Sequence, residues 1–175
     1  PLVKSGEDNI QRRALIMVTA PGGPSRIVQS PFGELPEAGP LEMGPIDYDE
    51  NGSVIFSGTS KIEGQVQVFA GDMPVGEHTV GANGRWFFIA AEILPLGTYD
   101  VTAELITEDA EPHKITVPFR RITQRALGGA AQDDLAVSFR SNVWQVSRTL
   151  NAGGRQYTAI FAPQKAAIPD GEAEN

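Results

Sequence analysis

Short runs in which every second residue is apolar recur between residues 46 and 121, and this rhythm constrains the fold more than any other feature. In Gly64–Ala70 valines alternate with glutamines, and in Thr98–Ile106 apolar residues alternate with Asp, Thr and Glu. A period of two is typical of a strand with one face buried and the other in water, as in antiparallel sheets. The sequence predicts six such strands, Ser53–Gly58, Gly64–Ala70, Pro74–Val80, Arg85–Ala90, Thr98–Ile106 and His113–Arg121. Six short strands in about 75 residues indicate an antiparallel β-sandwich.

Turn residues separate these runs. Asn51–Gly52 and Asn83–Gly84 are the strongest hairpin signals, because both residue types tolerate the positive φ that tight turns need. The 19 glycines and 13 prolines fall between short apolar runs, a punctuation that is typical of a β-rich protein.

The sequence before the sandwich is rich in proline. Residues 1–45 contain two β-like runs, Arg13–Thr19 and Ser25–Gln29. Because proline removes a backbone donor, the surrounding segments are unsuited to a central strand. We expect an extended N-terminal arm over residues 1–45, partly paired to a sheet edge, followed by the sandwich over residues 46–123.

The sequence after the sandwich changes period. Small residues at 124–134 predict a linker, and Leu135–Phe139 is predicted to form a strand. Two helices are predicted to follow, the first capped by Asn142 and the second ended by Pro163. The apolar residues that would share a face are Val143, Val146 and Leu150 in the first helix and Tyr157, Ile160 and Phe161 in the second. Residues 135–175 would therefore form a small strand-helix-helix segment.

Composition excludes several classes of function. The chain carries 22 acidic and 14 basic residues, for a net charge of −8, whereas nucleic-acid binding normally needs a basic surface. It contains no cysteine, so disulfides, thiol catalysis and cysteine-ligated metals are excluded. Apolar runs such as Ala14–Val18 and Trp86–Ala91 are too short to cross a bilayer. No signal-peptide pattern opens the chain, so it is either cytosolic or begins after a removed signal or anchor.

One acidic stretch resembles a calcium loop. Ile46–Gly58 has the D-x-D-x-N-G spacing with which an EF-hand loop begins, formed by Asp47, Asp49, Asn51 and Gly52. Position twelve, which needs a bidentate Glu, is Gly58, and residues 53–58 are predicted to be strand rather than helix. We therefore expect a structural hairpin turn, with no metal and no cofactor.

No arrangement of residues predicts catalysis. The two histidines, His78 and His113, fall in different predicted strands, where exposed or edge positions explain them better than catalysis does. Glu108, Asp109 and Glu111 lie in one loop, which is typical of a solvated charge cluster. No nucleophile elbow or phosphate-binding loop is present. We predict that the chain has no catalytic residue and is not an enzyme.

The predicted strand Arg85–Ala90 contains three adjacent aromatic residues, Trp86, Phe87 and Phe88. Successive side chains of a strand point to opposite faces, so the three cannot all lie on the same face. Core packing is predicted to take Trp86 and Phe88, which leaves Phe87 nearer the surface. Phe87 would then be covered by the N-terminal arm or form an exposed patch that binds a partner.

Residues 46–106 resemble the bacterial immunoglobulin-like modules of cell-envelope proteins. The resemblance rests on the D-Y-D-x-x-G turn, the F-S-G strand end, the V-x-V-F strand and the segment "ANGRW". "LPLGTYDV" (Leu94–Val101) is similar to the L-x-x-G-x-Y sequence before the sixth strand of such sandwiches. It implies that Tyr99 is a tyrosine-corner residue whose hydroxyl bonds to the upstream backbone.

Part of the C-terminal segment resembles a degenerate or truncated lysin motif (LysM), the β-α-α-β fold that binds peptidoglycan. "NVWQVSRTL" (Asn142–Leu150) is similar to S-L-W-R-I-A-R-x-L, with Trp144 on the family tryptophan. "GGRQYTAIF" (Gly153–Phe161) is similar to G-x-G-x-x-Y-x-x-I, with Tyr157 on the family tyrosine. The resemblance implies that Trp144 and Tyr157 pack the two helices together.

Both glycan-binding loops of that motif are altered here. Pro163 stands where the second helix should finish, and the closing strand is reduced to "IPDGEAEN". If a sugar site persists, the resemblance places it at Ser141, Asn142 and Gln164.

These observations together predict a non-catalytic structural or interaction module of the Gram-negative cell envelope, a subunit or accessory protein of a periplasmic assembly. Its partners would be other envelope or membrane-complex proteins, contacted through the arm and the sandwich surface. A genuine peptidoglycan-binding protein is the alternative, and a glycan hydrolase is a third interpretation.

Overall fold

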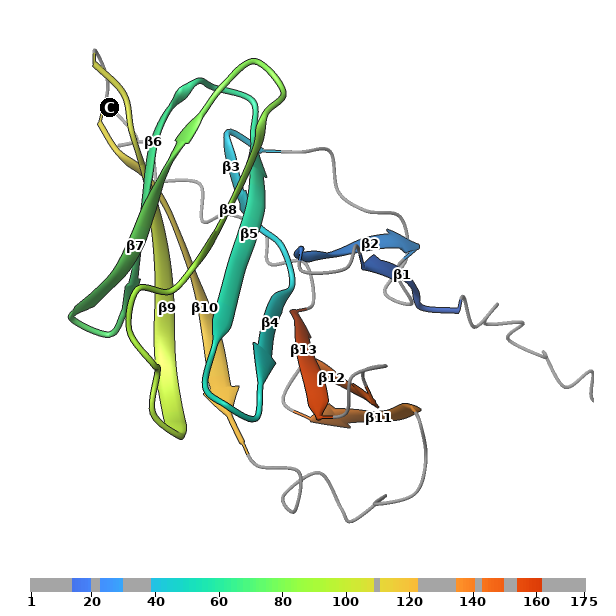
Figure 1. Cartoon of the computed structure of the whole chain (residues 1–175). Coiled ribbons are helices and arrows are strands. Elements are labelled where there is room, and N and C mark those ends of the chain that lie inside the picture. Colours follow the sequence, from blue (N-terminus) through green and yellow to red (C-terminus); the bar gives the residue numbers. More distant parts are fainter. Residues whose placement is uncertain are drawn as a thin grey trace, which may run out of the picture.

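The computed structural model describes residues 14–19, 23–29, 39–108, 111–122, 135–140, 143–149 and 154–161. These residues form thirteen strands and no helix (Figure 1). All the strand pairings are antiparallel. The predicted mainly β, antiparallel architecture is therefore confirmed.

One layer is a four-stranded sheet. Its order is β10 (His113–Arg121), β9 (Gly97–Ile106), β6 (Gly64–Ala70) and β7 (Met73–Val80). Each strand lies within about two residues of its predicted range, because the period-two pattern fixes which residues face the core.

The other layer is a seven-stranded sheet built around β5 (Val54–Ser60). One edge of β5 pairs with β8 (Arg85–Ile89), and its other edge pairs with β3 (Leu41–Met43) and β4 (Ile46–Asp49) in succession. The sheet continues beyond β4 through β13 (Arg155–Phe161), β12 (Val143–Thr149) and β11 (Leu135–Arg140).

The core lies between the two sheets. Both contribute alternate residues to one cluster of buried apolar side chains, including Trp86, Phe56, Val66, Leu105 and Phe119. Figure 1 shows β7, β6, β9 and β10 as one layer facing β8, β5 and β4. Burying these faces supplies the main favourable term for folding.

The predicted hairpin turns are present. Gly52 has a φ of 100° between β4 and β5, and Gly84 has a φ of 66° between β7 and β8. Asp49 stabilises the first turn, because its Oδ1 accepts a hydrogen bond of 3.0 Å from the Ser53 amide.

The two predicted C-terminal helices are wrong. Val143–Thr149 and Arg155–Phe161 are strands β12 and β13, and β13 pairs with β4. Tyr157 and Ala159 belong to the core between the sheets, while Thr158 and Ile160 are buried on the opposite face. A strand buried on both faces is a short continuous apolar run, which periodicity alone cannot distinguish from a helix.

The N-terminal region is more ordered than an extended arm. β1 (Ile16–Thr19) and β2 (Ser25–Gln29) pair with each other as a separate two-stranded sheet, which we call the N-terminal hairpin. β3, also predicted to be part of the arm, belongs to the seven-stranded sheet. Tertiary contacts hold the hairpin, since two strands alone are marginally stable in water.

Candidate binding pocket beside the N-terminal hairpin

A buried aspartate joins the hairpin to the seven-stranded sheet. Asp47 is 1% exposed, and it points away from the core because its neighbours Ile46 and Tyr48 point into it. Its carboxylate accepts hydrogen bonds of 2.6 Å from both the amide and the hydroxyl of Ser25 in β2. From β13 it accepts hydrogen bonds from the Thr158 hydroxyl and from Gln156 Nε2. Asp47 therefore links β2, β4 and β13.

The residues that resemble a calcium loop have structural roles here. The hairpin turn is confirmed, but Asp47 lies in strand β4 and is buried rather than being a turn residue. Asp49 is occupied by the turn, and Gly58 lies inside β5. Within the described ranges, no three His, Asp or Glu side chains gather to hold a metal ion.

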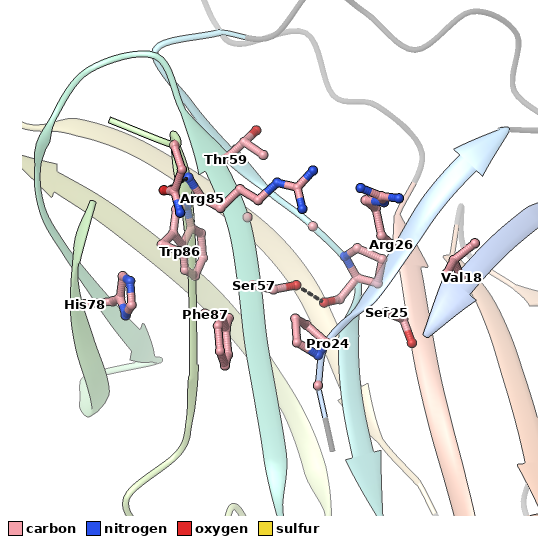
Figure 2. Close-up of a pocket in the computed structure, with 15 residues that line it drawn as sticks. Val18, Pro24, Ser25, Arg26, Ser57, Thr59, His78, Arg85, Trp86 and Phe87 are labelled. Atoms are coloured by element: carbon pink, nitrogen blue, oxygen red, sulfur yellow. Dashed lines mark hydrogen bonds between the residues drawn. The ribbon is translucent and has the colours of Figure 1, made fainter. Parts of the chain in front are cut away.

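A pocket of about 670 Å³ lies between the N-terminal hairpin and the outer face of β5 and β8 (Figure 2). Its volume falls within the range of ordinary ligand pockets. The residues that line it are Val18, Gly23, Pro24, Ser25, Arg26, Gly44, Pro45, Ser57, Gly58, Thr59, His78, Asn83, Arg85, Trp86 and Phe87. Asp47 fixes one wall of this pocket, because it holds Ser25.

The two faces of β8 differ sharply. Trp86 is 1% exposed and packs in the core beside Phe88, with 6.4 Å between ring centroids, as the sequence predicted. A side chain at Gly58 would collide with the Trp86 ring and with the Glu42 carbonyl, so this position requires glycine. Phe87, on the outer face, is 47% exposed and lines the pocket. The hairpin therefore faces Phe87 across the pocket and does not bury it.

Most of the neutral polar groups in the pocket are already paired. The Ser57 hydroxyl donates to the Pro45 carbonyl at 3.1 Å, and the Thr59 hydroxyl donates to Glu42 Oε2 at 3.1 Å. The Asn83 side-chain oxygen accepts a hydrogen bond from the Arg85 amide at 3.1 Å. The hydroxyl protons and the amide oxygen are thus occupied within the protein.

The polar groups of the pocket that remain available to a ligand are nitrogen donors. Arg26 and Arg85 make no side-chain hydrogen bond or ion pair with any described residue, and Figure 2 shows their guanidinium groups at the same side of the pocket. The buried Trp86 Nε1 also has no acceptor among the described residues. His78 stacks on Phe87, with 6.1 Å between ring centroids. Among the described residues that line the pocket there is no Asp or Glu, although the chain carries a net charge of −8.

The other predicted residues lie away from this pocket. Tyr99 Oη donates to the Pro95 carbonyl at 2.9 Å, the upstream backbone contact that the sequence predicted. Trp144 lies in β12 opposite Ile160, and Tyr157 lies in β13 rather than on a helix. His78 and His113 lie in β7 and β10, the two edge strands of the four-stranded sheet, so they do not form a pair. Ser141, Asn142 and Gln164 are outside the described residues.

Two buried tyrosines close the core where β4 meets β13. The Tyr48 and Tyr157 rings stack with 5.0 Å between centroids, and Phe119 meets Tyr48 edge-on at 5.6 Å. Burial raises the pKa of Tyr48 to about 12. Burial also raises the pKa of Tyr157.

The sequence missed the pocket and its two arginines. The adjacent aromatic residues at 86–88 were the only signal, because they marked Phe87 as either covered or available to a partner. Arg26 and Arg85 are about 59 positions apart in the sequence. Only the hairpin docking through Asp47 brings their segments to one pocket.

Comparisons with protein-family models, with curated proteins and with solved structures found no match. In the part of the chain that the structure describes, no helix is long and apolar enough to span a membrane.

Proposed function

We propose that this chain is a non-catalytic interaction module that holds a segment of a partner protein in the pocket beside the N-terminal hairpin. The observation that carries the proposal is the outer face of β8, where Phe87 and Ile89 are 47% and 59% exposed beside Arg85, which pairs with no described residue. Solvent-facing positions of an antiparallel sheet are normally polar. Apolar side chains gathered beside a pocket are typical of an interaction site.

We also propose that residues 39–122 are an immunoglobulin-like sandwich of a cell-envelope protein. The order β4-β5-β8 in one layer and β7-β6-β9-β10 in the other supports this fold. The Tyr99–Pro95 hydrogen bond supports it as a tyrosine corner. The periplasmic location rests on the resemblance of residues 46–106 to envelope modules.

We do not favour the alternative that the chain binds peptidoglycan. It rested on two packed helices, whereas residues 143–149 and 155–161 are strands β12 and β13. Pull-down with purified peptidoglycan sacculi tests it directly, and we expect no retention of the chain.

Site-specific photo-crosslinking tests the interaction module. A crosslinking amino acid at Phe87 should capture a partner in the native cell envelope. The same group at Thr102, on the outer face of the four-stranded sheet, is the matched control and should capture none. Phe87→Asp should abolish co-purification of the captured protein without lowering the melting temperature appreciably. Equal capture at both positions, or retention on sacculi, would contradict the proposal.

A further inference from the structure

The geometry points to an acidic segment of a partner protein, a carboxylate side chain flanked by apolar residues, as the occupant of the pocket beside the N-terminal hairpin. This inference rests on the proposed interaction function and adds the chemistry of the bound segment. It depends on three observations: the sign of the charges, the unused donors and the apolar surface that continues beyond the pocket.

The two charged side chains that line the pocket are both positive, and the Glu42 carboxylate meets the pocket only through the Thr59 hydroxyl. Arg26 extends from the hairpin and Arg85 from β8, so two different elements bring guanidinium groups to the same side of the pocket. Neither has an ion-pair partner among the described residues. A guanidinium binds a carboxylate through two parallel hydrogen bonds, which gives both strength and orientation. The charge complement of this pocket is therefore an anion.

The unused hydrogen-bonding groups of the pocket are donors. The guanidinium groups of Arg26 and Arg85 only donate, and they have no acceptor among the described residues. The hydroxyl protons of Ser57 and Thr59 already bind protein oxygens. A ligand that brings acceptor oxygens therefore gains more than one that brings donors.

The apolar surface extends beyond the pocket. Phe87 and Ile89 continue along β8, and Val18 and Val28 lie on the hairpin with about half of each side chain exposed. A small organic acid would fill the pocket and leave this surface in water. A peptide that carries apolar side chains on both sides of its carboxylate would cover it, so the surface favours a protein segment over a free acid.

Calorimetric titration of the full chain with capped pentapeptides tests the inference. The probe is Ala-Phe-Glu-Leu-Ala with blocked termini, and its neutral counterpart carries Gln in place of Glu. We expect the Glu peptide to bind about tenfold more tightly than the Gln peptide. Arg26→Gln and Arg85→Gln should each weaken the Glu peptide by about tenfold and leave the Gln peptide unchanged. Lys61→Gln removes one exposed positive charge outside the pocket and should change neither affinity.

Three results would overturn the inference. The first is equal affinity for the Glu and Gln peptides, and the second is a Lys61→Gln effect as large as the Arg85→Gln effect. The third is phenylacetate binding as tightly as the peptide, which would identify a free organic acid as the occupant.

Crosslinking separates this failure from failure of the interaction function. If the Phe87 crosslink is unchanged in the Arg26→Gln/Arg85→Gln chain, the interaction module stands and the carboxylate inference falls. If no crosslink forms at Phe87 in the unsubstituted chain, the interaction function itself falls.

Discussion

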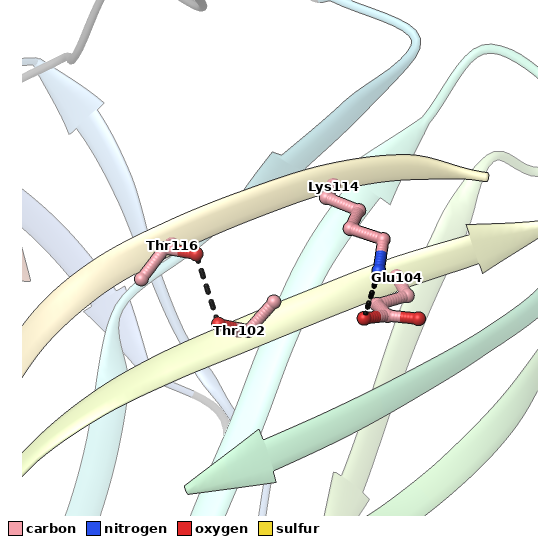
Figure 3. A network of polar contacts seen from close by, with 4 residues as sticks. All are labelled: Thr102, Glu104, Lys114 and Thr116. Carbon is pink, nitrogen blue, oxygen red and sulfur yellow. Dashed lines mark hydrogen bonds and ion pairs between the residues drawn. The ribbon is translucent and has the colours of Figure 1, made fainter. Parts of the chain in front are cut away.

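The two sheets of this protein share one core but present very different outer faces. On the four-stranded sheet, Thr102 pairs with Thr116 at 2.9 Å and Lys114 pairs with Glu104 at 2.7 Å across β9 and β10 (Figure 3). On the seven-stranded sheet, β8 instead exposes Phe87 and Ile89 beside Arg85, whose guanidinium has no partner in the part of the chain that the structure describes.

This difference separates a face adapted to water from a face suited to a ligand. Cross-strand pairs satisfy polar side chains within the sheet, so the outer face of the four-stranded sheet needs nothing further. The outer face of β5 and β8 instead carries apolar side chains that the rest of the described structure leaves exposed. The proposed binding site therefore lies on one sheet only, and four measurements test this difference between the two outer faces.

The largest expected effect separates the two faces of β8. Trp86→Ala removes a core side chain and should lower the free energy of unfolding by about 3–5 kcal/mol. Phe87→Ala removes an exposed ring and should cost less than about 1 kcal/mol. Urea denaturation of the two variants measures both. Similar losses would mean that Phe87 is a packing residue and that the outer face of β8 is not free for a partner.

The second effect concerns the attachment of the hairpin. Asp47→Ala removes the acceptor that holds the Ser25 amide and hydroxyl and the Thr158 hydroxyl, and should cost about 3 kcal/mol. Asp100→Ala, at an exposed position of the four-stranded sheet, is the matched control and should cost less than about 0.5 kcal/mol. Amide hydrogen exchange at Ser25 should accelerate only in the first variant. Unchanged exchange at Ser25 would show that the hairpin is held by other contacts.

The third effect tests whether the core-facing side chain of Tyr48, where β4 pairs with β13, is shielded from water. Because the pKa of Tyr48 is raised from 10 to about 12, the folded state keeps a proton that the unfolded state releases. The resulting stability is complete below pH 10 and is lost as the pH rises from 10 to 12, by about 3 kcal/mol. Denaturation curves at pH 9 and pH 11.5 should show a larger loss for the native sequence than for Tyr48→Phe. Equal losses would mean that Tyr48 is solvated.

The smallest effect lies on the four-stranded sheet. Lys114 is 57% exposed at its side chain, so its pair with Glu104 is screened by water. A double-mutant cycle on the two residues should give a coupling of about 0.2–1 kcal/mol. The coupling should shrink in 0.5 M salt, while a cycle on Thr102 and Thr116 should not respond to salt. A coupling well above this range would show that this outer face also contributes strongly to stability.

The sequence predicted the fold wherever one face of a strand is wet. The alternation of β6 and β9 and the turns at Gly52 and Gly84 follow from local chemistry, and each appears in the structure. The prediction failed at β12 and β13. In β13 the consecutive residues 157–160 are all buried, so no alternation of buried and exposed positions marks a strand, and the spacing of Tyr157 and Ile160 also fits a helix.

Sequence patterns could not predict the candidate pocket, because it depends on contacts between residues that are distant in the sequence. Asp47 was recognised as part of an acidic motif, but its role depends on Ser25 and Thr158, which lie 22 and 111 positions away. The pairing state of Arg26 and Arg85 is equally a tertiary property. Only the exposed Phe87 was anticipated, as one of two alternatives.

The pairing of β13 with β4 has a consequence for the order in which the chain folds. Contacts between residues so distant in sequence are expected to form late in folding. The chain must first pay the entropy of closing a long loop, before the contacts contribute favourable free energy. Until then β4 has an open edge beyond β5, a hazard for aggregation. The Asp47 carboxylate acquires its β13 donors only after residues 156–158 have been synthesised and docked. We therefore expect the N-terminal hairpin to dock on the seven-stranded sheet last. The proposed binding pocket would then form only when the rest of the chain has folded.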